Sequence, residues 1–430
     1  MLSVVCMCCV FCGCSFSTGV ENLLSPPKLT DSQEQIYSAL TRQVGSKIKL
    51  RYPKTGQYLS AFVVANIDGE PSDEAIVFYE RVGLSGAESA LRINVLDMRN
   101  GVWESVYDLA GIGTDIERVM LSDMGNDEYK VIIGFSLISD GDKNVILYDY
   151  TDEKLIPSAT YNYSLMELRD MNGDGISELF TVAAKSGGRL PEARLIALDN
   201  SWVSDYTLNA NVNDFAQIVY GCVTNDVYAF FIDEIIASGT IQTELLSFDG
   251  EKLISMGGMT SSGTDSILAS VRPQPYLCMD IDNDGVIEIP LRGVFPGYEK
   301  FEIESEQIPM IRWCSFENSN LSEKYSSYYS TLNSYIFVLP KRWNGNVTVK
   351  ILGDEVVFYA FNSPELSIES ELTELMRITV CTEQNIDTKN DEGYLTVKSS
   401  GSVYYCIKAS KEASPLMITP EEALLCFSFL

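Results

Sequence analysis

The stretch LMELRDMNGDGISELF, residues 165–180, joins two apolar, strand-like segments through an acidic turn that contains two glycines. The stretch YLCMDIDNDGVIEI, residues 276–289, has the same arrangement with one glycine in its turn, and looser versions occur at residues 61–79 and 119–133. Apolar runs bounded by Asn, Asp and Gly are typical of paired β-strands. This recurring strand–turn–strand unit therefore indicates a fold built from repeated β units.

The spacing of the units predicts the architecture. The acidic turns begin at Asn66, Asp123, Asp170 and Asp280, and the last interval is about twice the others. A fifth unit is therefore expected between them, where residues 217–223 and 226–232 read as paired strands. Four short strands per repeat is the size of a propeller blade. We predict a mainly β protein with a β-propeller-like array of about five to seven four-stranded blades; an irregular β-sandwich is the alternative.

The third and fourth turns match the pattern D-x-[DN]-x-D-G-x-x-E. Side chains at positions 1, 3 and 5, the carbonyl at position 7 and the carboxylate at position 9 converge in such a loop, and this oxygen-rich set suits Ca²⁺. The predicted calcium ligands are Asp170, Asn172, Asp174, the Ile176 carbonyl and Glu178 in one loop, and Asp280, Asp282, Asp284, the Val286 carbonyl and Glu288 in the other.

The first turn is a weaker metal candidate. Its possible ligands are Asn66, Asp68, Glu70 and Glu74, with Pro71 where the glycine belongs. The alternative for every turn is an Asx-rich β-turn whose carboxylates only cap backbone N–H groups. An EF-hand is excluded because strand-like sequence, not helix, flanks both complete loops.

These loops, repeated at blade spacing, resemble the FG-GAP or VCBS-type repeats of integrin-alpha-like β-propellers. The resemblance covers roughly residues 55–330 and is carried by the two complete loops. It implies that calcium binds between the strands of a blade and stiffens the propeller.

The two ends of the chain differ from the repeats. Residues 1–14 resemble a bacterial lipoprotein signal peptide with Cys14 as the lipidation site, although no basic residue follows Met1. We expect a flexible tether at 15–29, an amphipathic helix at 30–47 capped by Thr30, the calcium-binding propeller at 48–334 and a small α+β domain at 335–430. The expected location is the outer face of the cytoplasmic membrane of a Gram-positive bacterium, with the lipid anchor as the only membrane contact.

Composition excludes several functions. The 430 residues include 31 basic and 60 acidic side chains and no histidine, for a formal charge of −29. Such a chain without a basic cluster repels nucleic acid. Without imidazole, Ser-His-Asp catalysis and His-ligated zinc are also excluded. Carboxylate chemistry and oxygen-ligated cations remain.

Function is predicted only in outline. We expect a monomeric, lipid-anchored, calcium-stabilised binding or scaffold protein that is not an enzyme, with an unknown extracellular protein or carbohydrate as its partner. The alternative is an extracellular polysaccharide-acting enzyme on a β-propeller that uses carboxylate acid/base residues.

Overall fold

The protein is built mainly of β-strands. The computed structural model describes residues 29–83, 91–125, 128–137, 143–224, 226–363 and 365–430. The predicted signal peptide, Cys14 and nearly all of the tether lie outside these residues. Strands make up 52% of the structure and helices 9%, which confirms the predicted fold class. No helix in the described part is both long and apolar enough to cross a membrane.

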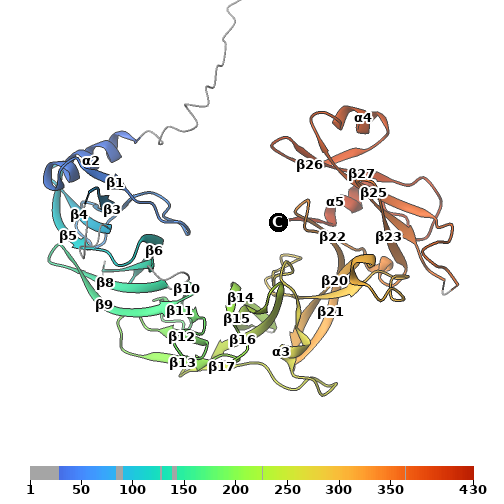
Figure 1. Ribbon diagram of the computed structural model, residues 1–430, viewed down its shortest axis with the longest axis horizontal. Helices are drawn as coiled ribbons and strands as arrows, with labels where there is room; N and C mark the ends of the chain where they lie inside the picture. Colours follow the sequence, from blue (N-terminus) through green and yellow to red (C-terminus); the bar gives the residue numbers. More distant parts are fainter. Residues whose placement is uncertain (1–28, 84–90, 126–127, 138–142, 225, 364) are drawn as a thin grey trace, which may run out of the picture. The chain divides into compact units, whose positions relative to one another are not determined.

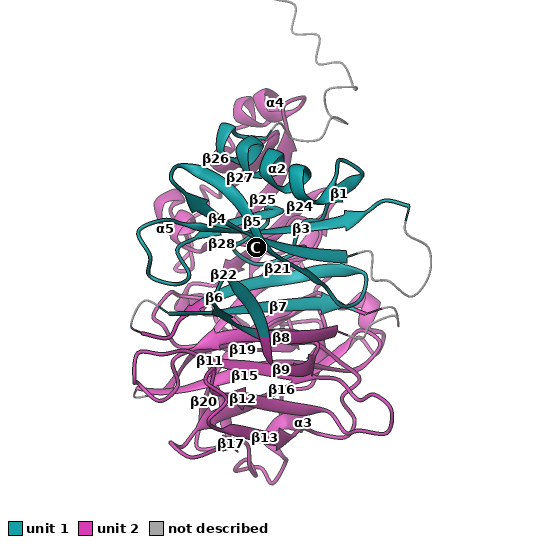
Figure 2. Ribbon diagram, turned by 90° about the vertical axis from the view of Figure 1, so that its left-hand side faces the viewer, with its two compact units in different colours: residues 1–121, 126–136, 148–156 teal, residues 122–125, 137–147, 157–430 magenta. Residues whose placement is uncertain are grey.

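The chain divides into two compact units (Figure 2). One comprises residues 1–121, 126–136 and 148–156, and the other comprises residues 122–125, 137–147 and 157–430. The first unit contains helix α2 (Asp31–Val44), which Thr30 caps by accepting a hydrogen bond from the Gln33 backbone. Ile36 and Leu40 of α2 are fully buried in one apolar cluster with the strands of the first sheet.

Within the described residues the strands form six successive sheets of four or five strands (Figure 1). The first sheet contains β1 (Ile48–Leu50), β2 (Phe62–Ala65), β3 (Glu74–Arg81), β4 (Leu91–Arg99) and β5 (Val102–Ala110). The second contains β6 (Asp115–Asp123), β7 (Tyr129–Ser136), β8 (Lys143–Thr151) and β9 (Lys154–Tyr163). The third contains β10 (Leu165–Arg169), β11 (Glu178–Ala183), β12 (Glu192–Ile196) and β13 (Val203–Thr207).

The remaining sheets lie in the second unit. The fourth contains β14 (Asp214–Thr224), β15 (Val227–Ala237), β16 (Thr240–Phe248), β17 (Leu253–Ser255) and the short β18 (Arg272–Pro273), and its β14–β15 pair is the predicted fifth unit. The fifth contains β19 (Ile289–Val294), β20 (Pro309–Glu317), β21 (Asn320–Ser330), β22 (Tyr335–Val338) and β28 (Phe427–Phe429). The sixth contains β23 (Val347–Leu352), β24 (Glu355–Ala360), β25 (Glu374–Thr382), β26 (Leu395–Ser400) and β27 (Val403–Ala409).

Short helices complete the second unit. They are α3 (Ser266–Ala269), α4 (Ile386–Asp391), α5 (Pro420–Leu425) and the 3-10 turns η1 (Glu304–Glu306) and η2 (Lys341–Trp343). The division expected at residue 335 falls between β21 and β22, which are neighbours in one sheet. Strand β28 then returns from the C-terminus to pair with β22. The domain division itself stays a prediction.

Apolar clusters join consecutive sheets of the second unit. One cluster combines the third and fourth sheets, where Phe180 of β11 stacks on Phe230 of β15 with ring centroids 3.7 Å apart. Another combines the fifth and sixth sheets around the fully buried Phe337, Trp343 and Phe358. Inner strands such as β11, which is buried along its whole length, therefore face apolar neighbours on both sides. Each sheet buries surface that it could not bury alone.

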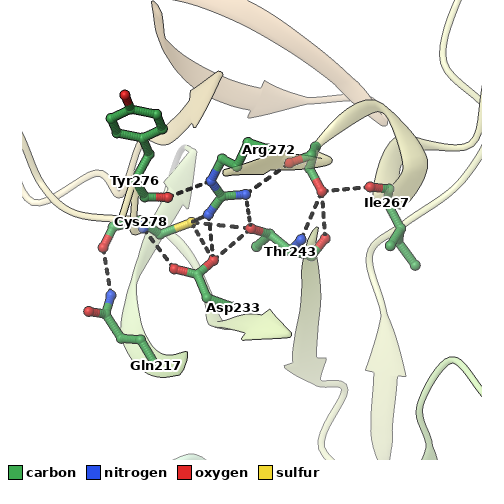
Figure 3. Close-up of polar contacts among 8 residues, drawn as sticks. Gln217, Asp233, Thr243, Ile267, Arg272, Tyr276 and Cys278 are labelled. Carbon is green, nitrogen blue, oxygen red and sulfur yellow. Dashed lines mark hydrogen bonds and ion pairs between the residues drawn. The ribbon is translucent and has the colours of Figure 1, made fainter. Parts of the chain in front are cut away.

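A buried polar network fixes the segment before the fourth acidic turn (Figure 3). The Arg272 guanidinium donates to the Asp233 carboxylate at 2.7 Å, and both side chains are fully buried. Arg272 also donates to the Thr243 hydroxyl and to the Tyr276 carbonyl, at 2.8 and 2.6 Å. The second oxygen of Asp233 accepts from the Cys278 backbone N–H at 2.8 Å. The network thereby ties residues 272–278 to β15 and β16, two residues before the turn begins.

This network predicts a large stability loss on substitution. Arg272→Met leaves the Asp233 carboxylate buried without its charged partner, which should lower the free energy of unfolding by about 3–5 kcal/mol. The control is Arg292→Met, because Arg292 pairs at 3.4 Å with the largely exposed Glu304, a contact worth about 0–1 kcal/mol. Urea denaturation measures both values, and equal losses would contradict this assignment.

Candidate functional site

Three of the acidic turns share one construction. Register places Glu74, Glu178 and Glu288 opposite the residue that precedes each loop. One carboxylate oxygen of each glutamate accepts a hydrogen bond from the backbone N–H at the second loop position, at 2.8, 2.8 and 3.1 Å respectively. All three glutamates are buried. The position-9 glutamate therefore lies beneath its loop and caps a backbone N–H group there.

Burial raises the pKa of all three glutamates. The effect brings the pKa of Glu74 to about 7, with the carboxylates of Asp68 and Asp97 adding to it. The pKa values of Glu178 and Glu288 are also raised, again mainly by burial. A buried carboxylate with a raised pKa is stabilised in its charged form by a nearby cation.

The third turn, residues 170–178, is ordered by its own backbone. The Asp170 carboxylate accepts from the Gly173 and Gly175 N–H groups at 2.7 and 2.9 Å. The Asn172 amide donates to both Asp174 and Glu178 at 2.9 Å. The amide nitrogen thus lies between the two carboxylates, and a cation would need Asn172 to present its oxygen instead.

The fourth turn, residues 280–288, already contains a positive charge. Carboxylate oxygens of Asp280, Asp282 and Glu288 lie within 4.8 Å of one another, which is close enough to hold a metal ion. Lys324 of β21 places its ammonium nitrogen 3.1 Å from Asp282, 2.5 Å from Asp284 and 3.0 Å from Glu288. The hydrogen bond from Lys324 lowers the pKa of Asp284. Lys324 therefore neutralises part of the cluster in which calcium was predicted.

The first two turns are less complete. In the first, Asn66 accepts from the Gly69 N–H at 2.8 Å and Asp68 accepts from the Glu70 N–H at 3.0 Å, as in an Asx-rich turn. In the second, Asp123 accepts from the Gly125 N–H at 2.7 Å, and residues 126–127 lie outside the described part. The carbonyl oxygens of Ile176 and Val286 and the calcium ions themselves stay predictions.

Sequence reasoning missed a pair of buried carboxyl groups on adjacent strands. Glu234 of β15 and Glu244 of β16 are 0% and 2% exposed, and they lie within hydrogen-bonding reach of each other. Burial raises the pKa of Glu234 to about 8, although the Gln242 amide donates to it at 2.7 Å. Burial also raises the pKa of Glu244. With this raised pKa, Glu234 holds a proton near neutrality.

A second missed feature is a polar pocket of about 440 Å³ in the second unit. Because β10 and β11 are antiparallel, the start of β10 lies beside the end of β11, and the 170–178 turn joins the two strands at their opposite end. The pocket lies at the end away from this turn. Its lining residues are Leu137, Lys143, Asn144, Asn162, Tyr163, Ser164, Ala183, Ala184, Lys185, Ser186, Arg189, Asn213 and Asp214.

A tight turn between β11 and β12 presents two of the cations in this pocket. The Arg189 N–H donates to the Ser186 carbonyl at 2.9 Å, and Gly187 and Gly188 take the positive φ angles that the turn requires. Turned so that its oxygen faces Arg189, the Asn162 amide accepts from the guanidinium at 3.0 Å. The turn thus holds Lys185 and Arg189 on the lining of one pocket.

Comparison with known proteins identifies no family, since no protein-family model and no curated protein matches the chain. Solved structures with a related arrangement include the exotype rhamnogalacturonan lyase YesX (10% identity, TM-score 0.30, covering 76% of this chain and 73% of the lyase). Rhamnogalacturonan lyase YesW has 11% identity and a TM-score of 0.31, covering 77% of this chain and 72% of the lyase. The exo-β-1,3-galactanase of Phanerochaete chrysosporium has 11% identity and a TM-score of 0.26, covering 79% of this chain and 73% of the galactanase. At these identities and TM-scores the likenesses carry no substrate, active-site residue or fold assignment over to this chain.

One expectation is corrected. The sequence led us to expect a protein that is not an enzyme, whereas these three structures are enzymes. That expectation was wrong, and it rested on two observations: the chain lacks histidine, and its visible acidic motifs all resemble cation loops. Asp214 and the pocket cations come from separate strand ends that linear spacing does not connect.

The acidic turns predict a calcium response that depends on Lys324. Removing calcium with a chelator should lower the melting temperature, and Asp174→Ala should remove part of that response. Lys324→Met should lower stability without calcium and increase the stabilisation that calcium gives, because the carboxylates lose their ammonium partner. Thermal unfolding across a calcium titration measures this, with Lys252→Met as an exposed-lysine control. A melting curve unchanged by calcium in every variant would refute the metal sites.

The Glu234–Glu244 pair predicts a pH dependence. The folded pKa of Glu234, about 8, lies above the ordinary value of 4.5, so between these values the folded chain holds a proton that the unfolded chain has lost. The contribution of Glu234 to the free energy of unfolding therefore falls as pH rises from about 4.5 to about 8. Glu234→Gln should remove this part of the slope in urea denaturation, whereas the exposed Glu251→Gln should keep it. Parallel slopes in all three proteins would contradict the assignment.

Proposed function

We propose that the protein is an extracellular enzyme that acts on polysaccharide, with the pocket at residues 137–214 as its substrate site. The observation that supports this most is the convergence of amide, hydroxyl and charged side chains on one cavity of about 440 Å³. Small-molecule sites typically have volumes of about 300–1,000 Å³ and a few convergent polar groups. Asn144, Asn162 and Asn213 carry amides, which both donate to and accept from sugar hydroxyls.

Asp214 is the proposed carboxylate for acid/base chemistry. It is the only acidic residue among the described pocket residues, it is exposed, and it begins β14. One of its oxygens accepts from the Phe215 N–H at 2.9 Å, which orients the carboxylate. The Glu234–Glu244 pair is not part of the pocket lining and is buried, so we assign it to stability.

Calcium has a supporting role in this proposal. As in the FG-GAP or VCBS-type repeats that the loops resemble, Ca²⁺ at residues 170–178 and 280–288 would fix the turns between paired strands. Oxygen donors of the preferred kind are present in both turns. The 170–178 turn and the pocket lie at opposite ends of β10 and β11, so calcium would stiffen the sheet without contacting substrate.

A lipid anchor at Cys14 accounts for the proposed location. Cys14→Ala should release the protein from membranes into the medium, because acylation supplies the only proposed membrane contact. Fractionation of cells that express the two forms measures this. Cys12→Ala is the matched control and should stay bound, and membrane retention of the Cys14 variant would refute the anchor.

The activity is tested with a panel of neutral and acidic polysaccharides. The wild-type protein should shorten at least one of them, detected as new chain ends and as a lower molecular mass. Asp214→Asn should reduce that rate by about 100-fold or more, since general acid or base groups contribute about 10²–10⁴-fold. Glu251→Gln, an exposed acid far along the chain from the pocket, should keep full activity. Equal activity of the wild-type protein and Asp214→Asn would reject Asp214 as the catalytic group.

A further inference from the structure

The pocket lining has more basic than acidic residues, whereas the whole chain has more acidic than basic residues. Acidic residues outnumber basic ones by 60 to 31 overall, yet the pocket lining has three cations, Lys143, Lys185 and Arg189, and one carboxylate, Asp214. The cations come from two separate places, the start of β8 and the turn between β11 and β12. Such a concentration of positive charge favours an anionic ligand.

Two of these cations differ from cations elsewhere in the structure. Cations such as Arg92, Arg377 and Lys324 have carboxylate partners at 2.5–2.7 Å. Among the residues that the structure describes, none forms an ion pair with Lys185, and Arg189 contacts the neutral Asn162 amide. In a chain with such an excess of carboxylates, two exposed cations in one pocket without a carboxylate partner are available to a ligand.

The chemistry of the lining indicates what kind of anion would bind. A guanidinium beside an ammonium suits a carboxylate, which Arg can bind through two parallel hydrogen bonds. The amides of Asn144 and Asn213 and the hydroxyl of Ser186 suit hydroxyl groups attached to the same ligand. A cavity of about 440 Å³ has room for a sugar ring as well as its anionic group.

We propose that this pocket binds a carboxylate-bearing sugar residue of an anionic polysaccharide, with Lys185 and Arg189 holding the carboxylate. The inference rests on the proposed function, because it names the substrate class of the same pocket. The positions of Lys185 and Arg189 on an exposed turn make them binding residues that can be replaced without disturbing the core.

The test is a calorimetric titration of the full chain with three probes: trigalacturonate, the matching neutral galactotriose and inorganic phosphate. Trigalacturonate should bind at least about tenfold more tightly than the neutral trisaccharide, a difference of about 1.4 kcal/mol. Lys185→Gln and Arg189→Gln should each weaken trigalacturonate binding about tenfold or more while leaving the melting temperature unchanged. The control Lys252→Gln, on an exposed turn outside the pocket, should bind like the wild-type protein.

Several results would overturn the inference. Equal binding of the acidic and neutral trisaccharides, or unchanged binding by both pocket variants, would show that the cations do not select a carboxylate. Phosphate that binds as tightly as trigalacturonate and displaces it would assign the pocket to a simple anion. Binding of trigalacturonate without turnover of any polysaccharide would reject the proposed enzyme and keep this inference, whereas turnover of neutral polysaccharide alone would reject this inference and keep the enzyme.

Discussion

The buried ion pair between Asp233 and Arg272 is the constraint on which much of the second unit depends. A buried pair of opposite charges is tolerated only when the remaining donor and acceptor atoms of both side chains also form hydrogen bonds. Here Thr243, Tyr276 and Cys278 supply those hydrogen bonds (Figure 3). Thr243 comes from β16, and Tyr276 and Cys278 come from the segment that leads to Asp280. The need to hydrogen-bond the buried Asp233 and Arg272 side chains therefore fixes where the fourth acidic turn begins.

The net charge of −29 does not show that acidic and basic side chains are separated locally in the structure. In the third sheet the acidic 170–178 turn joins β10 and β11 at one end of these strands, and the cationic pocket lies at their other end. Like charges gathered in a turn repel one another, and a cation offsets that repulsion. In the 280–288 turn Lys324 supplies such a cation from within the chain. The third sheet thus separates an acidic end from a cationic end.

The repeating part of the fold could be read from the sequence because it depends on local patterns. Runs such as residues 178–183 are apolar enough to be buried on both faces, and acidic or Asn-Gly turns separate them. The position of Glu178 and Glu288 beneath their loops also follows from spacing, since strand pairing places position 9 opposite the residue before position 1. By contrast, the pairing of β22 with β28 joins residues about 90 positions apart, and no local pattern encodes it.

The candidate sites show the same limit. Lys324 of β21 reaches Glu288, which directly precedes β19 of the same sheet. Asp214 of the fourth sheet lines one pocket with Lys185 and Arg189 of the third sheet, although about 25 residues or more separate it from them in the chain. The sequence alone established a mainly β repeat with oxygen-rich turns, because periodicity and turn chemistry act between residues close in the chain. The fold alone established the partners of those turns and the composition of the pocket, because side chains distant in sequence approach one another only after the sheets have formed and packed.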